Sequence, residues 1–235
     1  ACMIARKFDA HLVGVHTIPA LEFSLGLKAP TKLAEATGAF SKHEIAGQKA
    51  QAIFEEMTAK EGFTSEWREV DIQHMKHEYQ QITDWVASDL VIIGQSNPDR
   101  NKRSQKSNVE EAIRSSGRPV LVLPYAGNFQ TAGETVLVGW SGTREAARSV
   151  HDALPFIAAA KTTDIFWVGK QDETTHFQEN TAKELATTLG RHGANVTTTH
   201  KEPGTISIGD ELLNAASDGG ADLIVTGGFG HSKLY

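Results

Sequence analysis

The chain has 235 residues, of which 40% are hydrophobic, and a formal net charge of −6. This composition provides for a packed core, and it lacks the basic stripe that nucleic-acid binding would favour. Cys2 is the single cysteine, so no disulfide forms within the chain, and no apolar run reaches the roughly 20 residues that span a bilayer; we therefore expect a cytoplasmic protein with no membrane or nucleic-acid partner.

The first half of the chain predicts helices alternating with strands. Residues 3–5 form an apolar helix end and residues 12–15 a strand. A long amphipathic helix follows, and a polar, β-rich segment at 64–70 has the pattern of an edge strand. Asn108-Val-Glu-Glu111 resembles a capping box that starts a helix, and this helix leads to a strand at 120–123. The apolar stripe of the long helix comprises Ile45, Ala46, Ala50, Ile53, Phe54 and Met57.

The second half predicts the same succession, preceded by one additional strand at 136–140. After the turn Ser141-Gly-Thr143, one long helix is expected up to Ile157, then a strand at 165–168. A second amphipathic helix carries Ala182, Leu185, Ala186 and Leu189, and an edge strand at 195–200 follows. The last helix has an apolar stripe from Ile208 to Ala216 and stops at Gly219-Gly220.

Two segments establish that the halves are repeats of one unit. Ser88-Asp-Leu-Val-Ile-Ile-Gly94 and Ala221-Asp-Leu-Ile-Val-Thr-Gly227 lie 133 residues apart. Each has an uninterrupted apolar run, typical of a strand buried on both faces of a parallel sheet. We therefore predict two tandem, doubly wound α/β domains, 1–127 and 128–235. By comparison of the repeats, we expect that the first copy lacks its first strand and the second its last helix and strand.

Two loops are candidates for ligand binding. Gly227-Gly228-Phe-Gly230-His231-Ser232 follows a buried strand, where glycine N–H groups can face a phosphate. Trp140-Ser141-Gly142-Thr143 also follows a strand, and ligands of open parallel sheets gather at the carboxyl ends of strands. Two structural alternatives stay open, namely a tight turn at the glycines and a helix N-cap at Thr143.

These motifs resemble the universal stress protein family in its tandem, two-domain bacterial form. The resemblance implies Rossmann-like domains that pair as a pseudo-dimer, and ATP binding in some members. Gly227 and Gly230 match the first half of the late motif of ATP-binding members. Val168 matches a Val that lies beside the adenine, whereas Ser141 stands where the family usually has an Asp that contacts the nucleotide. In the first copy Asn97 replaces the second glycine, so we interpret that loop as degenerate.

The predicted function is an ATP-binding regulator of the stress response that uses the second domain. ATP or a related adenine nucleotide, with Mg²⁺, is the expected ligand, and an unknown protein is the expected partner; a homodimer also stays open. The alternative is a nucleotide-independent protein-interaction module with a decayed pocket. No metal-binding residue is predicted, because His74 and His77 lack further ligands at a diagnostic spacing. No catalytic residue is predicted either, because no general base is identifiable; a slow ATPase is left open. The predicted site comprises Trp140, Ser141, Gly142, Thr143, Val168, Gly227, Gly228, Gly230, His231 and Ser232.

Overall fold

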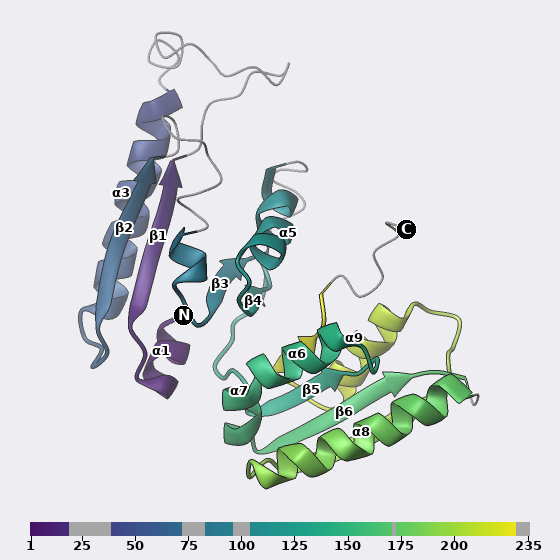
Figure 1. The fold of residues 1–235 in the computed structure, drawn as a ribbon. Helices are drawn as coiled ribbons and strands as arrows, with labels where there is room; N and C mark the ends of the chain where they lie inside the picture. The colour runs from purple at the N-terminus through teal and green to yellow at the C-terminus, as the bar shows by residue number, and fades with distance from the viewer. Residues whose placement is uncertain (19–38, 72–82, 96–103, 171–172, 229–235) are drawn as a thin grey trace. The chain divides into compact units, whose positions relative to one another are not determined.

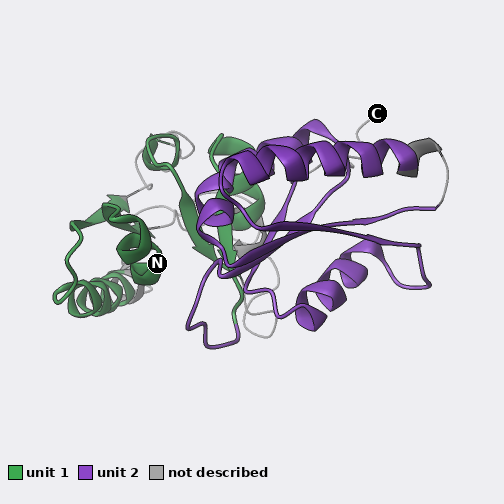
Figure 2. Ribbon diagram, turned by 90° about the horizontal axis from the view of Figure 1, so that it is seen from below, with its two compact units in different colours: residues 1–125 green, residues 126–235 purple. Residues whose placement is uncertain are grey.

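The computed structural model describes residues 1–18, 39–71, 83–95, 104–170 and 173–228. Its contacts divide the chain into two compact units, Ala1–Tyr125 and Ala126–Tyr235, which Figure 2 colours separately. Each unit contains parallel strands and helices that alternate along the chain, as Figure 1 shows. The predicted α/β class is therefore confirmed.

Unit 1 contains two separate pairs of parallel strands. β1 pairs with β2, and Gly14 lies opposite Trp67 in that pair. β3 pairs with β4 in the same way, with Val91 opposite Val120. The elements of unit 1 are α1 (Cys2–Phe8), β1 (Leu12–Ile18), α3 (Ala39–Thr58), β2 (Ser65–Asp71), β3 (Val91–Gly94), α5 (Ser104–Ser115) and β4 (Val120–Leu123).

Helix α3 buries only part of the stripe that the sequence predicts. Ile45, Ile53 and Met57 are 50%, 57% and 58% exposed. The face turned toward the strands instead carries Phe54, whose ring centroid lies 5.5 Å from that of Trp67. The predicted stripe was wider than one helix face, and the aromatic contact determines which part of it is covered.

Two helix boundaries also differ from the sequence prediction. Helix α5 begins at Ser104, so the capping-box pattern at Asn108 lies inside the helix rather than at its start. The helix predicted from Arg144 to Ile157 is two helices, α6 (Arg144–Asp152) and α7 (Leu154–Ala159). Pro155 stands in the first turn of α7, and it breaks the longer helix because proline has no backbone N–H and its ring clashes with the preceding turn.

Unit 2 is built on a four-stranded parallel sheet in the order β7-β6-β5-β8. The predicted additional strand, β5, lies between β6 and β8, and β7 is at the edge, as its polar sequence indicated. Gly139 on β5 lies opposite Phe166 on β6 and Thr226 on β8. Besides α6 and α7, unit 2 comprises β5 (Thr135–Gly139), β6 (Thr162–Val168), α8 (Glu173–Arg191), β7 (Val196–Lys201), α9 (Ile208–Asp218) and β8 (Leu223–Thr226).

Helices cover both faces of this sheet, as Figure 2 shows in the edge-on view of unit 2. On one face, Val136 and Val138 of β5 pack with residues of α6, α7 and α8 in a core cluster. On the other, Leu137 packs with Phe166 and with Ala216 of α9. Alternate residues of β5 thus enter opposite cores, which is why its sequence is apolar without interruption. The doubly wound architecture is confirmed in this unit.

Asp222 connects the beginnings of β5 and β8. Its Oδ1 accepts hydrogen bonds from the backbone N–H groups of Glu134 and Thr135, both at 2.9 Å. Burial raises the pKa of Asp222, but hydrogen bonds from Thr131 and from these N–H groups outweigh it and hold the pKa below its ordinary value. Asp89, the matching residue of the first repeat, is exposed. Asp222 therefore helps to align β5 with β8 in unit 2.

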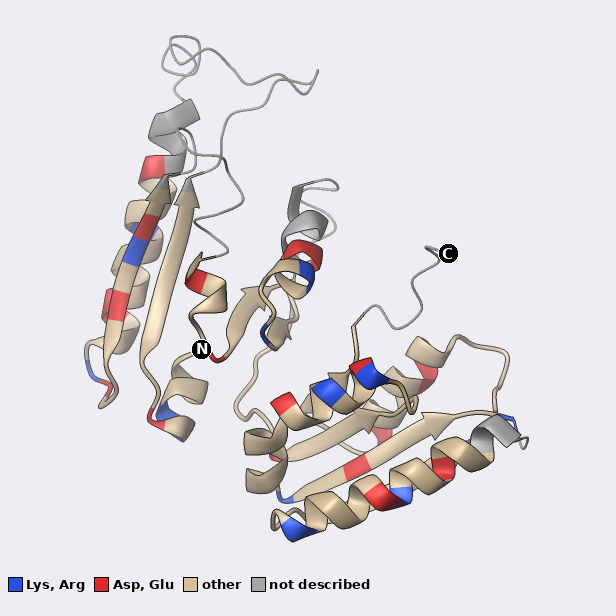
Figure 3. Ribbon diagram, viewed as in Figure 1, with Lys and Arg blue, Asp and Glu red and all other residues tan. Residues whose placement is uncertain are grey.

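Charges of both signs are interspersed over the described helices, as Figure 3 shows. Ion pairs between residues one helical turn apart join Arg148 to Asp152 on α6 and Lys183 to Glu179 on α8.

Among the described residues, no helix is both long and apolar enough to cross a membrane.

Candidate functional site

The two candidate loops of unit 2 leave the sheet at the same edge. β5 and β8 are neighbours in parallel register, with Gly139 opposite Thr226. The turn at 140–143 therefore directly follows β5, and Gly227 directly follows the neighbouring strand β8. Gly230, His231 and Ser232, the rest of the predicted glycine loop, lie outside the described residues.

Gly227 passes directly against the beginning of helix α6. A Cβ atom at this position would lie 2.8 Å from the backbone N of Ala146 and 2.8 Å from the carbonyl carbon of Glu145. Both are main-chain atoms and cannot rotate away. This contact gives Gly227 a packing role and brings the backbone after β8 to the first turn of α6. Gly228, the next residue, is exposed.

The turn after β5 has a specific hydrogen-bonded structure. Thr143 is the N-cap of α6, because its Oγ1 accepts from the N–H of Ala146 at 3.3 Å. The Ser141 hydroxyl lies 3.0 Å from the Thr143 hydroxyl and is exposed. Gly142 has φ +70°, a conformation that glycine adopts without strain. The N-cap alternative considered for Thr143 is therefore observed, and Ser141 is exposed beside it.

Trp140 belongs to the core beneath this turn. It is 9% exposed and is part of the cluster between the sheet and helices α6 to α8. Its indole Nε1–H donates to Thr181 Oγ1 of α8 at 3.0 Å, and its backbone N–H donates to Phe166 O at 2.8 Å. Trp140 therefore anchors the turn from below rather than facing the exterior.

Helix α8 packs beside the turn at 140–143, a contact that the sequence did not indicate. The Phe177 ring lies against Gly142: its Cε1 is 3.1 Å from where a Cβ of that glycine would stand. Gln178 Nε2 donates to the Ser141 carbonyl at 3.4 Å. The apolar residues chosen from the helical pattern begin at Ala182, so Phe177 was missed, although an aromatic residue near the start of a long helix was the available signal.

Val168 ends β6 on the neighbouring side of the turn. It lies opposite Lys201 of β7 and packs at the margin of the cluster under α9. The chain continues beyond it in strand-like pairing, since the Gly169 N–H donates to the Lys201 carbonyl at 3.1 Å. The structure thus places Val168 at the same edge of the sheet as Ser141 and Gly227.

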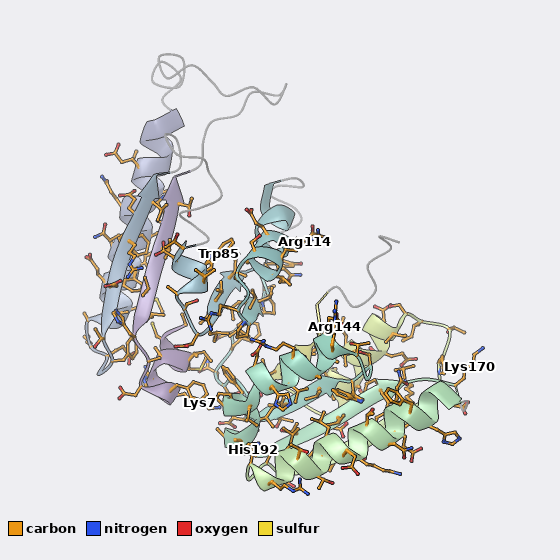
Figure 4. The ribbon with its side chains drawn as sticks, in the orientation of Figure 1. Lys7, Trp85, Arg114, Arg144, Lys170 and His192 are labelled. Carbon is orange, nitrogen blue, oxygen red and sulfur yellow. The ribbon has the colours of Figure 1, made fainter. Side chains whose placement is uncertain are left out.

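One exposed cation stands at the beginning of α6. The Arg144 side chain is 93% exposed, and its Nε lies 2.6 Å from Glu145 Oε1; Figure 4 labels it at this helix end. The hydrogen bond from Arg144 lowers the pKa of Glu145. The positive end of the α6 dipole also faces this edge. Because Glu145 offsets the charge of Arg144, the attraction for an anion at the turn comes mainly from this helix end.

A surface hollow of about 260 Å³ lies elsewhere on unit 2. Its lining includes Thr135 and Asp164, which stand in the first halves of β5 and β6, away from the turn at 140–143. Thr197 and Thr199 donate to Asp164 Oδ1 at 2.8 and 3.1 Å, so this carboxylate is already engaged within the sheet. No group of three or more metal-binding side chains occurs in the described ranges; His74 and His77 fall outside them.

The fold was compared with those of known proteins. No protein-family model matches the chain, and no curated protein matches it in sequence. A universal stress protein from Archaeoglobus fulgidus DSM 4304 matches 91% of this chain and 74% of its own length, with a TM-score of 0.60 and 14% identity. The chain has the universal stress protein fold.

The match to the universal stress protein fold extends over both units, because 91% of the chain exceeds what either unit contains. The resemblance that the turn and glycine motifs indicated is thus confirmed at the level of the fold. Protein Rv1636 from Mycobacterium tuberculosis H37Rv is also similar, at 25% identity and a TM-score of 0.35, over 44% of this chain and 78% of that protein.

Proposed function

We propose that unit 2 binds an adenine nucleotide and that the bound state regulates a protein partner during the stress response. The observation that carries this proposal is the meeting of the two loops: Gly227 packs on the first turn of α6, beside the turn at 140–143. Backbone N–H groups and a helix N-terminus at one edge of a parallel sheet are suited to a phosphate chain.

Each part of the nucleotide has a candidate partner at this edge. The phosphates would lie over Gly228 and the start of α6, where the exposed Arg144 would exchange its ion pair with Glu145 for a phosphate oxygen. Mg²⁺ would be held mainly by the phosphates and water, as is usual for this ion. The exposed Ser141 hydroxyl would take the place of the family's Asp, and Val168 would lie beside the base.

Unit 1 does not offer the same combination. No described atom lies within 4 Å of a Cβ placed on Gly94, the counterpart of Gly227. In the first repeat Asn97 stands where the second repeat has Gly230. We therefore propose one nucleotide site per chain.

Equilibrium titration with ATP and Mg²⁺ by calorimetry tests this function. We expect saturable binding near one site per chain. Gly230→Val should abolish it, because a branched side chain would occupy the space of the phosphate, whereas Asn97→Val, at the matching position of the first repeat, should leave it unchanged. Circular dichroism should show that both variants are folded. Equal losses from the two substitutions would contradict a single site in unit 2.

A second function is favoured by a different observation, the three exposed apolar side chains of α3. Ile45, Ile53 and Met57 are each at least half exposed, and such side chains on one helix suit contact with a protein partner. In that alternative the chain is an interaction module without a nucleotide. Absence of binding at millimolar ATP, together with loss of a partner from an Ile53→Asp variant, would support it.

A further inference from the structure

We propose that Phe177 is the stacking platform for the base of the nucleotide and gives the site a preference for purines. This inference rests on the proposed function and extends it to a residue that the glycine and turn motifs do not include. The Phe177 side chain is 57% exposed. It nevertheless lies against Gly142, in the middle of the turn that joins β5 to α6.

The position of the ring is set by contacts of the residues that follow it along α8. One residue further, Gln178 Nε2 donates to the Ser141 carbonyl at 3.4 Å. One turn further, Thr181 Oγ1 accepts from Trp140 Nε1 at 3.0 Å, and its own hydroxyl donates to Gln178 O at 3.0 Å. These hydrogen bonds join helix α8 to the turn, so that Phe177 stands beside Gly142 rather than on an independent surface.

Gly142 is part of the same arrangement. With φ +70° it adopts a conformation that side chains disfavour. A Cβ there would also stand 3.1 Å from Phe177 Cε1 and 3.5 Å from Cδ1. The absence of a side chain at Gly142 lets the ring approach the backbone of the turn, which leads into the helix end proposed for the phosphates.

The repeat provides an internal comparison. Phe177 lies 19 residues before the first residue of β7, Val196, and Ala46 lies 19 residues before the first residue of β2, Ser65. Both residues are exposed on the corresponding long helices. Unit 1, whose glycine loop is degenerate, thus has a methyl group where unit 2 has an aromatic ring. The ring and the intact Gly-Gly sequence occur together.

An exposed phenyl ring beside a phosphate-compatible edge is suited to one part of a nucleotide, the planar base. Stacking on an aromatic side chain tolerates any base but strengthens with the overlapping ring area, so a purine gains more than a pyrimidine. We therefore expect ATP to bind more tightly than CTP, and we expect Phe177 to be the source of that difference.

The test compares ATP, CTP and inorganic tripolyphosphate binding to the unaltered chain, to Phe177→Ala and to Phe177→Trp. Phe177→Ala should weaken ATP binding about 10-fold and reduce the preference for ATP over CTP. Tripolyphosphate should be unaffected by the substitution. Phe177→Trp should restore ATP affinity, because the indole also stacks, and this rescue distinguishes stacking from general damage to the turn.

The outcomes separate this inference from the function on which it rests. If the unaltered chain does not bind ATP, the proposed function fails and the role of Phe177 with it. If the chain binds ATP and Phe177→Ala binds it equally well, only the stacking role is overturned. Parallel losses for ATP, CTP and tripolyphosphate would also overturn it, because they would show that the ring supports the turn and does not contact the base.

Discussion

Gly227→Ala offers the sharpest test of how the two loops of unit 2 are held together. The added methyl would stand 2.8 Å from Ala146 N and from the Glu145 carbonyl carbon, and 3.0 Å from Glu145 Cβ. Two of these three atoms belong to the main chain of α6. The helix or the end of β8 must therefore move by several tenths of an ångström to admit the methyl.

Two effects of opposite sign determine how much Gly227→Ala changes the unfolding free energy. Overpacking of this kind costs about 1–3 kcal/mol. Gly227 is not among the described glycines with positive φ, so alanine can adopt its backbone conformation, and the smaller entropy of the unfolded chain returns about 0.4–1 kcal/mol. We expect the clash to dominate and unit 2 to lose about 1–2 kcal/mol of unfolding free energy.

Urea unfolding, monitored by tryptophan fluorescence, measures the loss of unfolding free energy. Amide hydrogen exchange should assign that loss to α6 and β8. Gly94→Ala is the matched control, since it stands at the same place in the repeat with no described atom within 4 Å of its Cβ position. That variant should be neutral or slightly stabilised. Equal stability of Gly227→Ala and the unaltered chain would refute the close contact between β8 and α6.

Three further predictions concern the same unit. Thr143→Ala should destabilise α6 by about 1 kcal/mol through loss of its N-cap, with Thr143→Ser close to the unaltered chain in thermal unfolding. Asp222→Ala leaves two backbone N–H groups without their acceptor and should cost about 1–3 kcal/mol in urea unfolding, whereas Asp89→Ala should change little. Because folding lowers the pKa of Asp222, its contribution to the unfolding free energy is complete above the ordinary Asp pKa of about 3.9 and is lost as the pH falls through the folded value. The unfolding free energy of Asp222→Ala, measured against pH, should lack this acid-dependent loss. Trp140→Phe should cost about 0.5–1.5 kcal/mol, non-additively with Thr181→Val, since both remove one hydrogen bond.

The sequence was sufficient to predict the layered fold, because the strongest signals in it are long-range and repeated. Two matching apolar runs identified β3 and β8, and the pattern at 136–140 identified the central strand β5. A strand buried on both faces has few alternatives to a parallel sheet between helices. The meeting of the two loops also followed, since adjacent parallel strands end at one edge.

The sequence could not predict which of several similar helix faces packs against a neighbouring element. The apolar stripe on α3 included Ile53 and Phe54, and the contact of Phe54 with Trp67 turned the helix so that Ile53 is exposed. Phe177 was missed for the converse reason, because its importance comes from Gly142, 35 residues away in sequence. Periodicity describes one helix at a time and does not identify its neighbour.

The polar sequence of β7 bears on how unit 2 behaves at high concentration. β7 stands at the edge of the four-stranded sheet. Its residues Thr197, Thr198, Thr199 and Lys201 are exposed. Polar and charged side chains on an edge strand discourage pairing with a strand of another molecule. This edge of unit 2 should therefore resist strand pairing between molecules as the protein concentration rises.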